Sequence, residues 1–342
     1  MSLKQSYEES VTLILERISH QMPYDLVEKF SEFSHLSKAD IHPIKNRPFH
    51  LVSAIDGSNA IIAESGSFAL AAIRAAHTDF LSGNRYARAI TPLTVVSVGP
   101  EEENADFKIL MNDCFGIFPE TDLINNDAER VSAILRDTLE YWIAHQQAKT
   151  LPEGSLLLLD GALRVTDQNH DPILQEIIRT ARNRNVLLAA VTKRTRATWG
   201  GGHPLLPAVG GFVRESGISG PWWVRIDEHL LDSAVYKRGR QGDLYVASVH
   251  PSKNFPLKME LPKGTDEQTV EMIMSSIAAC SDDGRIPGYP YPLLDAHRTV
   301  VIDQSLTEQI RQDLMNGFAS QGLNKEIFDL LFGDIHDDFK RY

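Results

Sequence analysis

The sequence predicts an α/β protein, because short apolar strands alternate with amphipathic helices along the chain and no repeat or low-complexity tract interrupts them. Two strands carry the clearest signal. Residues 50–55 form an apolar run, and residues 155–160 contain four consecutive leucines, which is typical of a strand buried on both faces. Between them, residues 128–148 repeat apolar residues at helical spacing, after Asn126 or Asp127 as the capping residue.

The other predicted elements follow from the same periodicities and from glycine and proline punctuation. Residues 67–80 are rich in alanine and fit either a helix or a strand. The remaining elements are an amphipathic helix at 5–33, a strand at 93–100, a helix at 171–185, a strand at 186–192, an irregular glycine-rich loop at 199–212, a hairpin of strands at 243–251 and 255–262, a helix at 266–280, a helix near Leu293 that follows a Gly/Pro-rich loop, and a terminal helix with a polar tail.

Composition limits the kind of protein. The 342 residues are 42% hydrophobic, which suffices for a sizeable core in one large domain or two closely joined ones. The formal charge of −12 argues against a general basic surface for nucleic acid, so any polyanion must be bound locally. Cys114 and Cys280 lie far apart and match no metal-ligand spacing, which favours a cytoplasmic setting. We expect no membrane association, because no apolar run is long enough to cross a bilayer.

Two aspartates stand out because each follows a predicted strand and precedes a glycine. Asp56 follows the run at 50–55, and Asp160 ends the leucine-rich strand. Asp-Gly is also a common turn signal, so either residue alone is explained by a turn. Two carboxylates at neighbouring strand ends repel each other unless a divalent cation or a proton lies between them, and oxygen ligands suit Mg²⁺ or Mn²⁺ better than zinc. Phosphate loops, nucleophile elbows and zinc-protease pairs are missing from the sequence.

Four segments in order, "AIDGSNA", "LLLLDGAL", "AAVTKRTR" and "GYPYPLLDAHR", resemble the successive motifs of the NurA nucleases, which partner the HerA ATPase. The resemblance covers about residues 50 to 303. It implies an RNase H-like core with a mixed central sheet flanked by helices, preceded here by an N-terminal helical segment. It also implies a divalent metal, Mn²⁺ or Mg²⁺, hydrolysis of DNA from the 5′ side, and a homodimer docked on a hexameric HerA-type ATPase.

With this resemblance we divide the chain into an N-terminal helical segment (1–45), a nuclease domain (46–310) and a C-terminal helix and tail (311–342). The N-terminal helix offers an apolar seam for a C2 homodimer and for docking the ATPase.

The resemblance and the chemistry together assign the metal ligands. Asp56 and Asp160 are predicted to hold the metal and to be essential for catalysis. RNase H-like sites take a third carboxylate from a helix, and we choose Glu140, although a helical wheel places it nearly opposite the apolar face of its helix. Asp137 and Glu129 are rivals that the wheel does not favour either.

Basic and histidine side chains complete the predicted site. Lys193 ends a strand, as the aspartates do, and is predicted to bind the scissile phosphate or orient water, with Arg194 and Arg196 as further DNA contacts. Asp295 and His297 match the family motif: the first is predicted as a metal ligand, the second as a catalytic residue that contacts phosphate or moves a proton. Alternatively, Asp295 caps a helix and His297 is a partly buried structural residue.

The predicted function is a metal-dependent DNA nuclease acting at DNA ends, as a 5′ to 3′ exonuclease or also as a single-strand endonuclease, in the resection of double-strand breaks. Two alternatives from other classes remain open. One is a catalytically inactive DNA-binding or ATPase-docking module, and the other is a metal-dependent phosphatase acting on small substrates.

Overall fold

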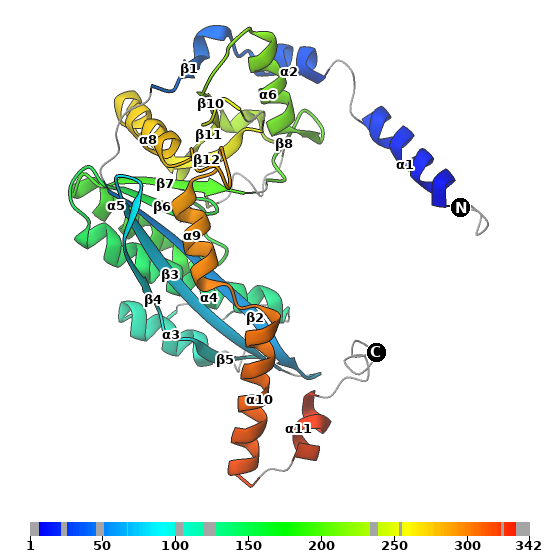
Figure 1. The fold of residues 1–342 in the computed structure, drawn as a ribbon, viewed down its shortest axis with the longest axis vertical. Helices are drawn as coiled ribbons and strands as arrows, with labels where there is room; N and C mark the ends of the chain where they lie inside the picture. The colour runs from blue at the N-terminus through cyan, green and yellow to red at the C-terminus, as the bar shows by residue number, and fades with distance from the viewer. Residues whose placement is uncertain are drawn as a thin grey trace.

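A computed structural model describes most of the chain: residues 7–21, 26–45, 51–66, 68–99, 105–119, 123, 127–193, 195–232, 239–252, 255–322 and 325–332. It contains one large mixed sheet with helices on both faces, which confirms the predicted α/β class (Figure 1). A two-stranded sheet, β8 (Thr198–Trp199) with β9 (His203–Pro204), lies apart from it. Within the described residues, no helix has the length and apolar character needed to cross a membrane.

One half of the large sheet has the RNase H-like strand order. Three strands form an antiparallel meander, two further strands run parallel to the first of them, and β5 pairs with the far end of β3, so that the order is β4-β3-β2-β6-β7. These strands are β2 (Leu51–Glu64), β3 (Ala69–Leu81), β4 (Asn84–Ile90), β5 (Thr94–Val98), β6 (Leu156–Asp160) and β7 (Leu187–Thr192).

The other half extends the sheet beyond β7 with antiparallel strands. They are, outward from β7, β12 (Leu257–Pro262), β11 (Gly242–Ser248), β10 (Trp222–Ile226) and β1 (Ile41–Pro43). The predicted hairpin is therefore present as β11 and β12. Residues 69–80 of the alanine-rich segment, which the sequence left open between helix and strand, belong to β3. They pair with β2 on one side and with β4 and β5 on the other, and this pairing outweighs the low strand propensity of alanine.

Helices cover both faces of the sheet. Three of them, α3 (Ala105–Phe115), α4 (Ala128–Thr150) and α5 (Asp171–Asn183), share a core with one face of the RNase H-like half. Two more, α8 (Glu267–Ala279) and α9 (Tyr291–Val300), pack on the opposite face. α2 (Leu26–Ser34) and α6 (Leu205–Glu215) cover β10 and β11.

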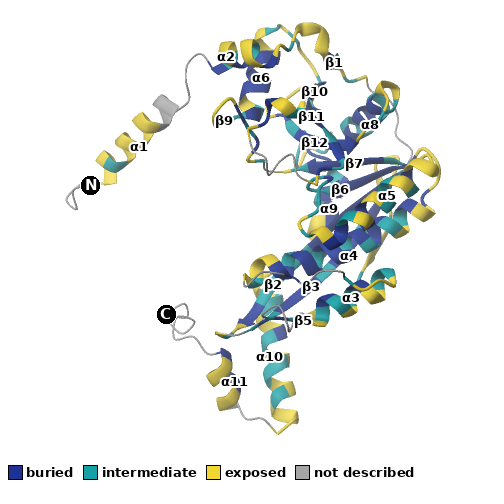
Figure 2. Cartoon of the chain, turned by 180° about the vertical axis from the view of Figure 1, so that it is seen from behind, coloured by how far each residue is buried: buried dark blue, intermediate teal, exposed yellow. Residues whose placement is uncertain are grey.

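The helices at the two ends of the chain lie away from the centre. After α9, the chain continues through α10 (Gln304–Ser320) to α11 (Lys325–Phe332), beside the far ends of β2 and β3 (Figure 1). The predicted domain boundary at residue 310 falls inside α10. The first helix, α1 (Tyr7–Gln21), stands away from the body and is mostly exposed (Figure 2).

The structure corrects the predicted strand at 50–55, which does not end at Asp56. β2 continues to Glu64, and the Asp56–Gly57 pair lies in its interior, in register with Ala76 and Ala75 of β3. On the other side of β2, the pairing with β6 stops at Ile55. Asp56 therefore does not form a turn; it lies where β2 loses one of its two neighbours.

Two helix predictions are also corrected. The helix predicted at 5–33 is described as two helices, α1 and α2, and residues 22–25 between them lie outside the described part of the chain. The loop predicted at 199–212 contains β9 and much of α6 instead. α6 forms despite two glycines because its apolar face is buried, and a Cβ at Gly211 would lie 2.5 Å from the Val27 side chain of α2. Close packing of two helices thus outweighs the low helix propensity of glycine.

Candidate active site

Asp56 and Asp160 come together from neighbouring parallel strands. Ala54 and Leu158, two residues before each aspartate, belong to the core beneath α8 and α9. Because side chains alternate along a strand, both aspartates point to that same face. Asp56 is 5% exposed, and Asp160 is partly buried.

Lys193 joins the two carboxylates. It directly follows β7, the strand beside β6, and its Nζ lies 2.6 Å from Asp160 Oδ2 and 3.4 Å from Asp56 Oδ2. Burial disfavours the charged ammonium, but the charges of Asp56 and Asp160 outweigh this and raise the pKa of Lys193 above its ordinary value. The structure thus brings together three of the residues that the sequence singled out.

His297 reaches the same point from α9, which packs across β2 and β3. Its Nδ1 lies 2.8 Å from Asp56 Oδ2. The first turn of α9 is tied to the sheet, since Thr78 Oγ1 of β3 donates a hydrogen bond to the carbonyl of Pro292. The His297 side chain is 47% exposed, so the imidazole borders both the carboxylates and solvent.

Glu140 approaches the aspartates from the opposite face of β2. Its side chain is only 17% exposed and lies against Gly57, whose missing side chain leaves room for it. The helical wheel is therefore misleading here: α4 is packed against several elements and is buried around much of its circumference, so a residue away from the main apolar stripe can also face β2. Of the rivals, Asp137 is paired with Arg136, and Glu129 is exposed in the first turn of α4.

Arg136 supports Glu140 one helical turn earlier. Its Nε lies 3.1 Å from Glu140 Oε1, its Nη2 donates to Asp137 Oδ1 at 2.6 Å, and its Nη1 donates to Asn59 Oδ1 of β2 at 3.1 Å. The guanidinium is held between α4 and β2 by these contacts. Glu140 is consequently fixed in position rather than free to move in solvent.

Burial and mutual repulsion disfavour the ionised form of the carboxylates, and a bound cation would offset this effect. Burial raises the pKa of Glu140 well above its usual range, and the charges of Asp137, Asp56 and Asp160 add to this against the opposing effect of Arg136. Burial and then the charge of Asp56 raise the pKa of Asp160. A divalent cation would favour the ionised form of these groups, so the donor set suits Mg²⁺ or Mn²⁺.

The described carboxylates do not form a complete set of metal ligands in this arrangement. Among the described residues, no group of three or more His, Cys, Asp and Glu side chains is close enough to hold a metal ion. The ammonium of Lys193 lies between Asp56 and Asp160, and the guanidinium of Arg136 binds Glu140. The carboxylates fit the metal by the chemistry of their oxygens, and these two cations neutralise them here.

Tyr289 is a residue that the sequence did not single out. Its hydroxyl is buried and has no hydrogen-bond partner among the residues that the structure describes. Burial, followed by the charges of Asp160 and Asp56, raises the pKa of this phenol, so the ring lies close to both carboxylates. The signal in the sequence is "GYPYP", where glycine and proline indicate a loop and Tyr289, directly after the glycine, is an aromatic residue inside the family-like motif.

Asp295 is not brought to the carboxylate pair. Its buried side chain binds Arg85 of β4 through both oxygens, with Arg85 Nε 2.8 Å from Oδ2. Two residues before His297 on a helix, Asp295 points away from the face that carries His297. The prediction of Asp295 as a metal ligand is therefore not supported, and the ion pair ties α9 to β4 instead.

Two of the three predicted DNA contacts, Lys193 and Arg196, lie within the described residues. Lys193 is placed as described above, and Arg196 is exposed beyond β7. Arg194 lies outside the described residues.

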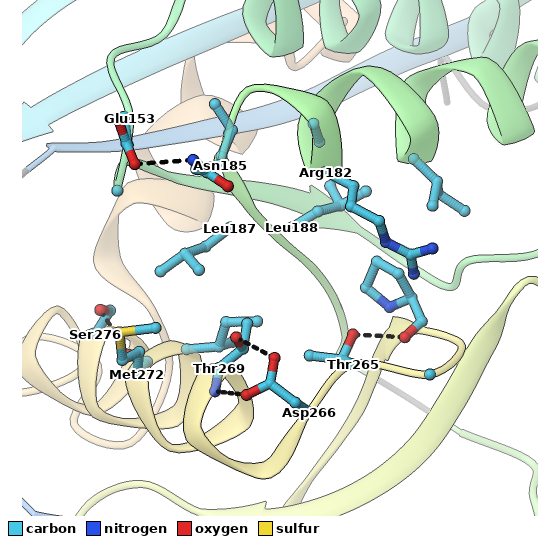
Figure 3. A pocket seen from close by; sticks show the side chains of 17 residues that line it. Glu153, Arg182, Asn185, Leu187, Leu188, Thr265, Asp266, Thr269, Met272 and Ser276 are labelled. Atoms are coloured by element: carbon cyan, nitrogen blue, oxygen red, sulfur yellow. Dashed lines mark hydrogen bonds between the residues drawn. The ribbon is translucent and has the colours of Figure 1, made fainter.

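A separate pocket lies at the N-terminal ends of β6 and β7 and is not this site. It has a volume of about 920 Å³ and is lined by α5, α8 and the residues that precede β6 and β7. Its polar groups are partly satisfied among themselves, since Asn185 bonds Glu153, and Thr269 bonds Asp266 (Figure 3). Asp160 is the last residue of β6 and Lys193 follows β7, so the candidate site lies at the opposite ends of these two strands, which are about 15–20 Å long.

The strand order defines the class of the protein: an RNase H-like α/β fold, in which Asp56 and Asp160 come together from neighbouring parallel strands. Within this class the chain belongs to the NurA family, because the NurA domain matches residues 50–302. This confirms the resemblance seen in the four sequence motifs. No curated protein sequence matches the chain.

Solved structures share this fold. The NurA nuclease from Sulfolobus solfataricus matches with a TM-score of 0.59 at 13% identity, covering 93% of this chain and 98% of that one. A second NurA structure gives 0.53 at 11% identity, with 91% and 98% covered. NurA bound to dAMP and manganese gives 0.52 at 9% identity, with 95% and 99% covered. The RNase H-like prediction is thereby confirmed.

Proposed function

We propose that this DNA nuclease of the NurA family depends on a divalent metal, Mn²⁺ or Mg²⁺, held by Asp56, Asp160 and Glu140. The observation that supports the proposal is that burial raises the pKa of Glu140 of α4, and that Asp56 of β2 and Asp160 of β6 lie close enough for their charges to raise it further. When bound, the metal supplies an activated water and neutralises charge on the phosphate.

The other side chains of the site act on the substrate directly. Lys193 moves from the carboxylates to a phosphate oxygen of the scissile bond and stabilises its charge there. His297, held by Asp56 through Nδ1, keeps Nε2 available to exchange a proton with the attacking water or the leaving oxygen. The buried Tyr289 hydroxyl, which has no partner among the described residues, is available to donate a hydrogen bond to a group bound in the site. Arg196, together with Arg194, binds the neighbouring DNA backbone.

At the level of the cell, we propose a cytoplasmic enzyme that acts at DNA ends in double-strand-break resection together with a HerA-type hexameric ATPase. It cuts from 5′ to 3′ and also cleaves single strands internally. A C2 homodimer presents one site to each strand of a duplex. The N-terminal segment, residues 1–45, contributes to the dimer or to the docking of the ATPase.

The proposal is tested with linear DNA labelled at the 5′ or 3′ end and with a chromogenic phosphate ester, each in Mn²⁺, Mg²⁺ or EDTA. We expect metal-dependent loss of the 5′ label first, no hydrolysis of the ester, and no activity in Asp160→Asn. DNA binding without cleavage would indicate an inactive binding module, and hydrolysis of the ester alone would indicate a phosphatase. A parallel arm with a HerA-type ATPase tests whether the partner stimulates cleavage.

A further inference from the structure

Gly57 lies in the interior of β2, where a glycine needs an explanation. It pairs with Ala75 of β3 and is not among the residues with positive φ, so its backbone conformation is open to any amino acid. Glycine in a strand interior weakens the strand, since it has no side chain to pack and loses more conformational freedom on folding. No turn is present that would require it.

Side chains of α4 occupy the space beside Gly57. A Cβ at this position would lie 2.5 Å from Glu140 Oε1, 2.9 Å from Glu140 Cγ and 2.8 Å from Arg136 Cγ. All three contacts are too short for a real Cβ, and all three involve side-chain atoms and not backbone. Glu140 and Arg136 therefore fill the volume that any other residue at position 57 would occupy.

The direction of this approach matters for the site. Ile55 belongs to the core beneath α4, so Gly57, two residues later, faces α4 while Asp56 faces α9. A carboxylate on α4 can come close to the aspartates only by lying directly against β2 at this point. The Asn59 side chain, two residues further along the same face, binds Arg136 and holds it against β2 beside Gly57.

We propose that Gly57 is a positioning residue: its missing side chain forms the seat that holds the Glu140 carboxylate beside Asp56 and Asp160. This inference rests on the proposed function, because it takes Glu140 as a metal ligand. It assigns the glycine of the Asp-Gly pair to metal binding and not to a turn. Any side chain at position 57 displaces the third carboxylate without touching the other two.

The test compares wild type, Gly57→Ala, Glu140→Ala and the double variant, with Gly66→Ala as control because a Cβ there meets nothing within 4 Å. Each protein is unfolded by heat with EDTA and across a Mn²⁺ titration, and its DNA cleavage is measured. We expect Gly57→Ala to weaken Mn²⁺ binding about 10- to 100-fold, as supporting residues of metal sites do. Gly66→Ala should behave as wild type.

The double variant separates positioning from a general effect on the fold. If Gly57 acts through Glu140, adding Gly57→Ala to Glu140→Ala changes neither Mn²⁺ affinity nor cleavage further. Should Gly57→Ala fail to fold alone, the double variant must fold, because removing the Glu140 side chain removes two of the three short contacts and releases Arg136, which makes the third, from its ion pair with Glu140. Additive losses, wild-type behaviour of Gly57→Ala, or a double variant that also fails to fold would each overturn the inference. Wild-type Mn²⁺ affinity in Glu140→Ala would instead contradict the proposed function.

Discussion

At the scale of single residues, the ammonium of Lys193 neutralises Asp56 and Asp160 when no metal is bound, so its contribution to stability can be measured separately from its effect on cleavage. We predict that Lys193→Met lowers the free energy of unfolding without metal by about 1 kcal/mol, a value reduced for the partial exposure of the ammonium. Mn²⁺ should still stabilise the variant, at least as much as wild type, since no ammonium competes for the carboxylates.

Cleavage by Lys193→Met should nevertheless fall by roughly 10²- to 10³-fold, because a charge-stabilising donor is lost. The raised pKa of Lys193 adds a pH dependence: its stabilising effect is complete below its ordinary value of 10.5 and is lost as pH rises through the folded-state pKa. The stability difference between the two proteins should therefore shrink at strongly alkaline pH. Loss of Mn²⁺ stabilisation together with cleavage would indicate a structural role instead.

The site residues also show what a sequence can and cannot predict at this scale. Asp160 and Lys193 meet as predicted, because they stand at the ends of the neighbouring parallel strands β6 and β7. Asp56 joins them from the interior of β2, where the pairing with β6 stops, and His297 reaches Asp56 from α9. Tyr289 and Arg136 were not predicted, because their importance depends on a hydroxyl and a guanidinium buried near acidic groups. Asp295 was assigned from its motif alone, and its Arg85 partner lies 210 residues away in sequence.

At the scale of elements, α4 carries Glu140 and begins at a cap that the sequence predicted. Asp127 accepts hydrogen bonds from the backbone N–H groups of Glu129 and Arg130 at 3.1 and 3.3 Å. We predict that Asp127→Ala lowers the free energy of unfolding by about 1 kcal/mol in urea titrations, whereas Asp127→Asn, an equally good cap, is nearly neutral. Equal loss in both variants would show that the charge, and not the cap, stabilises the helix.

Element boundaries were predictable where local signals determine them and wrong where tertiary contacts do. The capped helix α4, the leucine-rich β6 and the hairpin of β11 and β12 follow from periodicity and turn residues. β2 runs through Asp56–Gly57 because β3 continues to pair with it, which no local signal reveals. α6 forms in a glycine-rich stretch because α2 packs against it, again through a distant segment.

At the scale of the whole molecule, the N-terminal segment has two parts with different roles. α1 is exposed, with Tyr7 84% and Leu15 60% accessible, whereas Phe30 of α2 is fully buried against Trp199, with ring centroids 5.0 Å apart. We predict that deleting residues 1–21 leaves the free energy of unfolding unchanged. Extending the deletion to residue 33 removes Phe30 and costs at least about 3–5 kcal/mol.

The shorter deletion also tests the proposed assembly without harming the fold. Light scattering should give a dimeric mass for the full chain and a monomeric mass, or lost co-purification with a HerA-type ATPase, for the deletion. If the deletion keeps both the dimer and the ATPase contact, α1 has neither role.

The central claim is that buried carboxylates from separate elements hold a divalent metal for DNA hydrolysis. It is tested most directly by the cleavage rate of Asp56→Asn on end-labelled linear DNA in Mn²⁺. Asparagine keeps the shape of the side chain and removes the charge that binds the cation. We predict a rate lower by at least about 10³-fold, because the metal supplies both the activated water and the charge neutralisation. Thermal unfolding in EDTA should show an intact fold, and added Mn²⁺ should stabilise the variant much less than wild type. Cleavage at a near wild-type rate would contradict the claim.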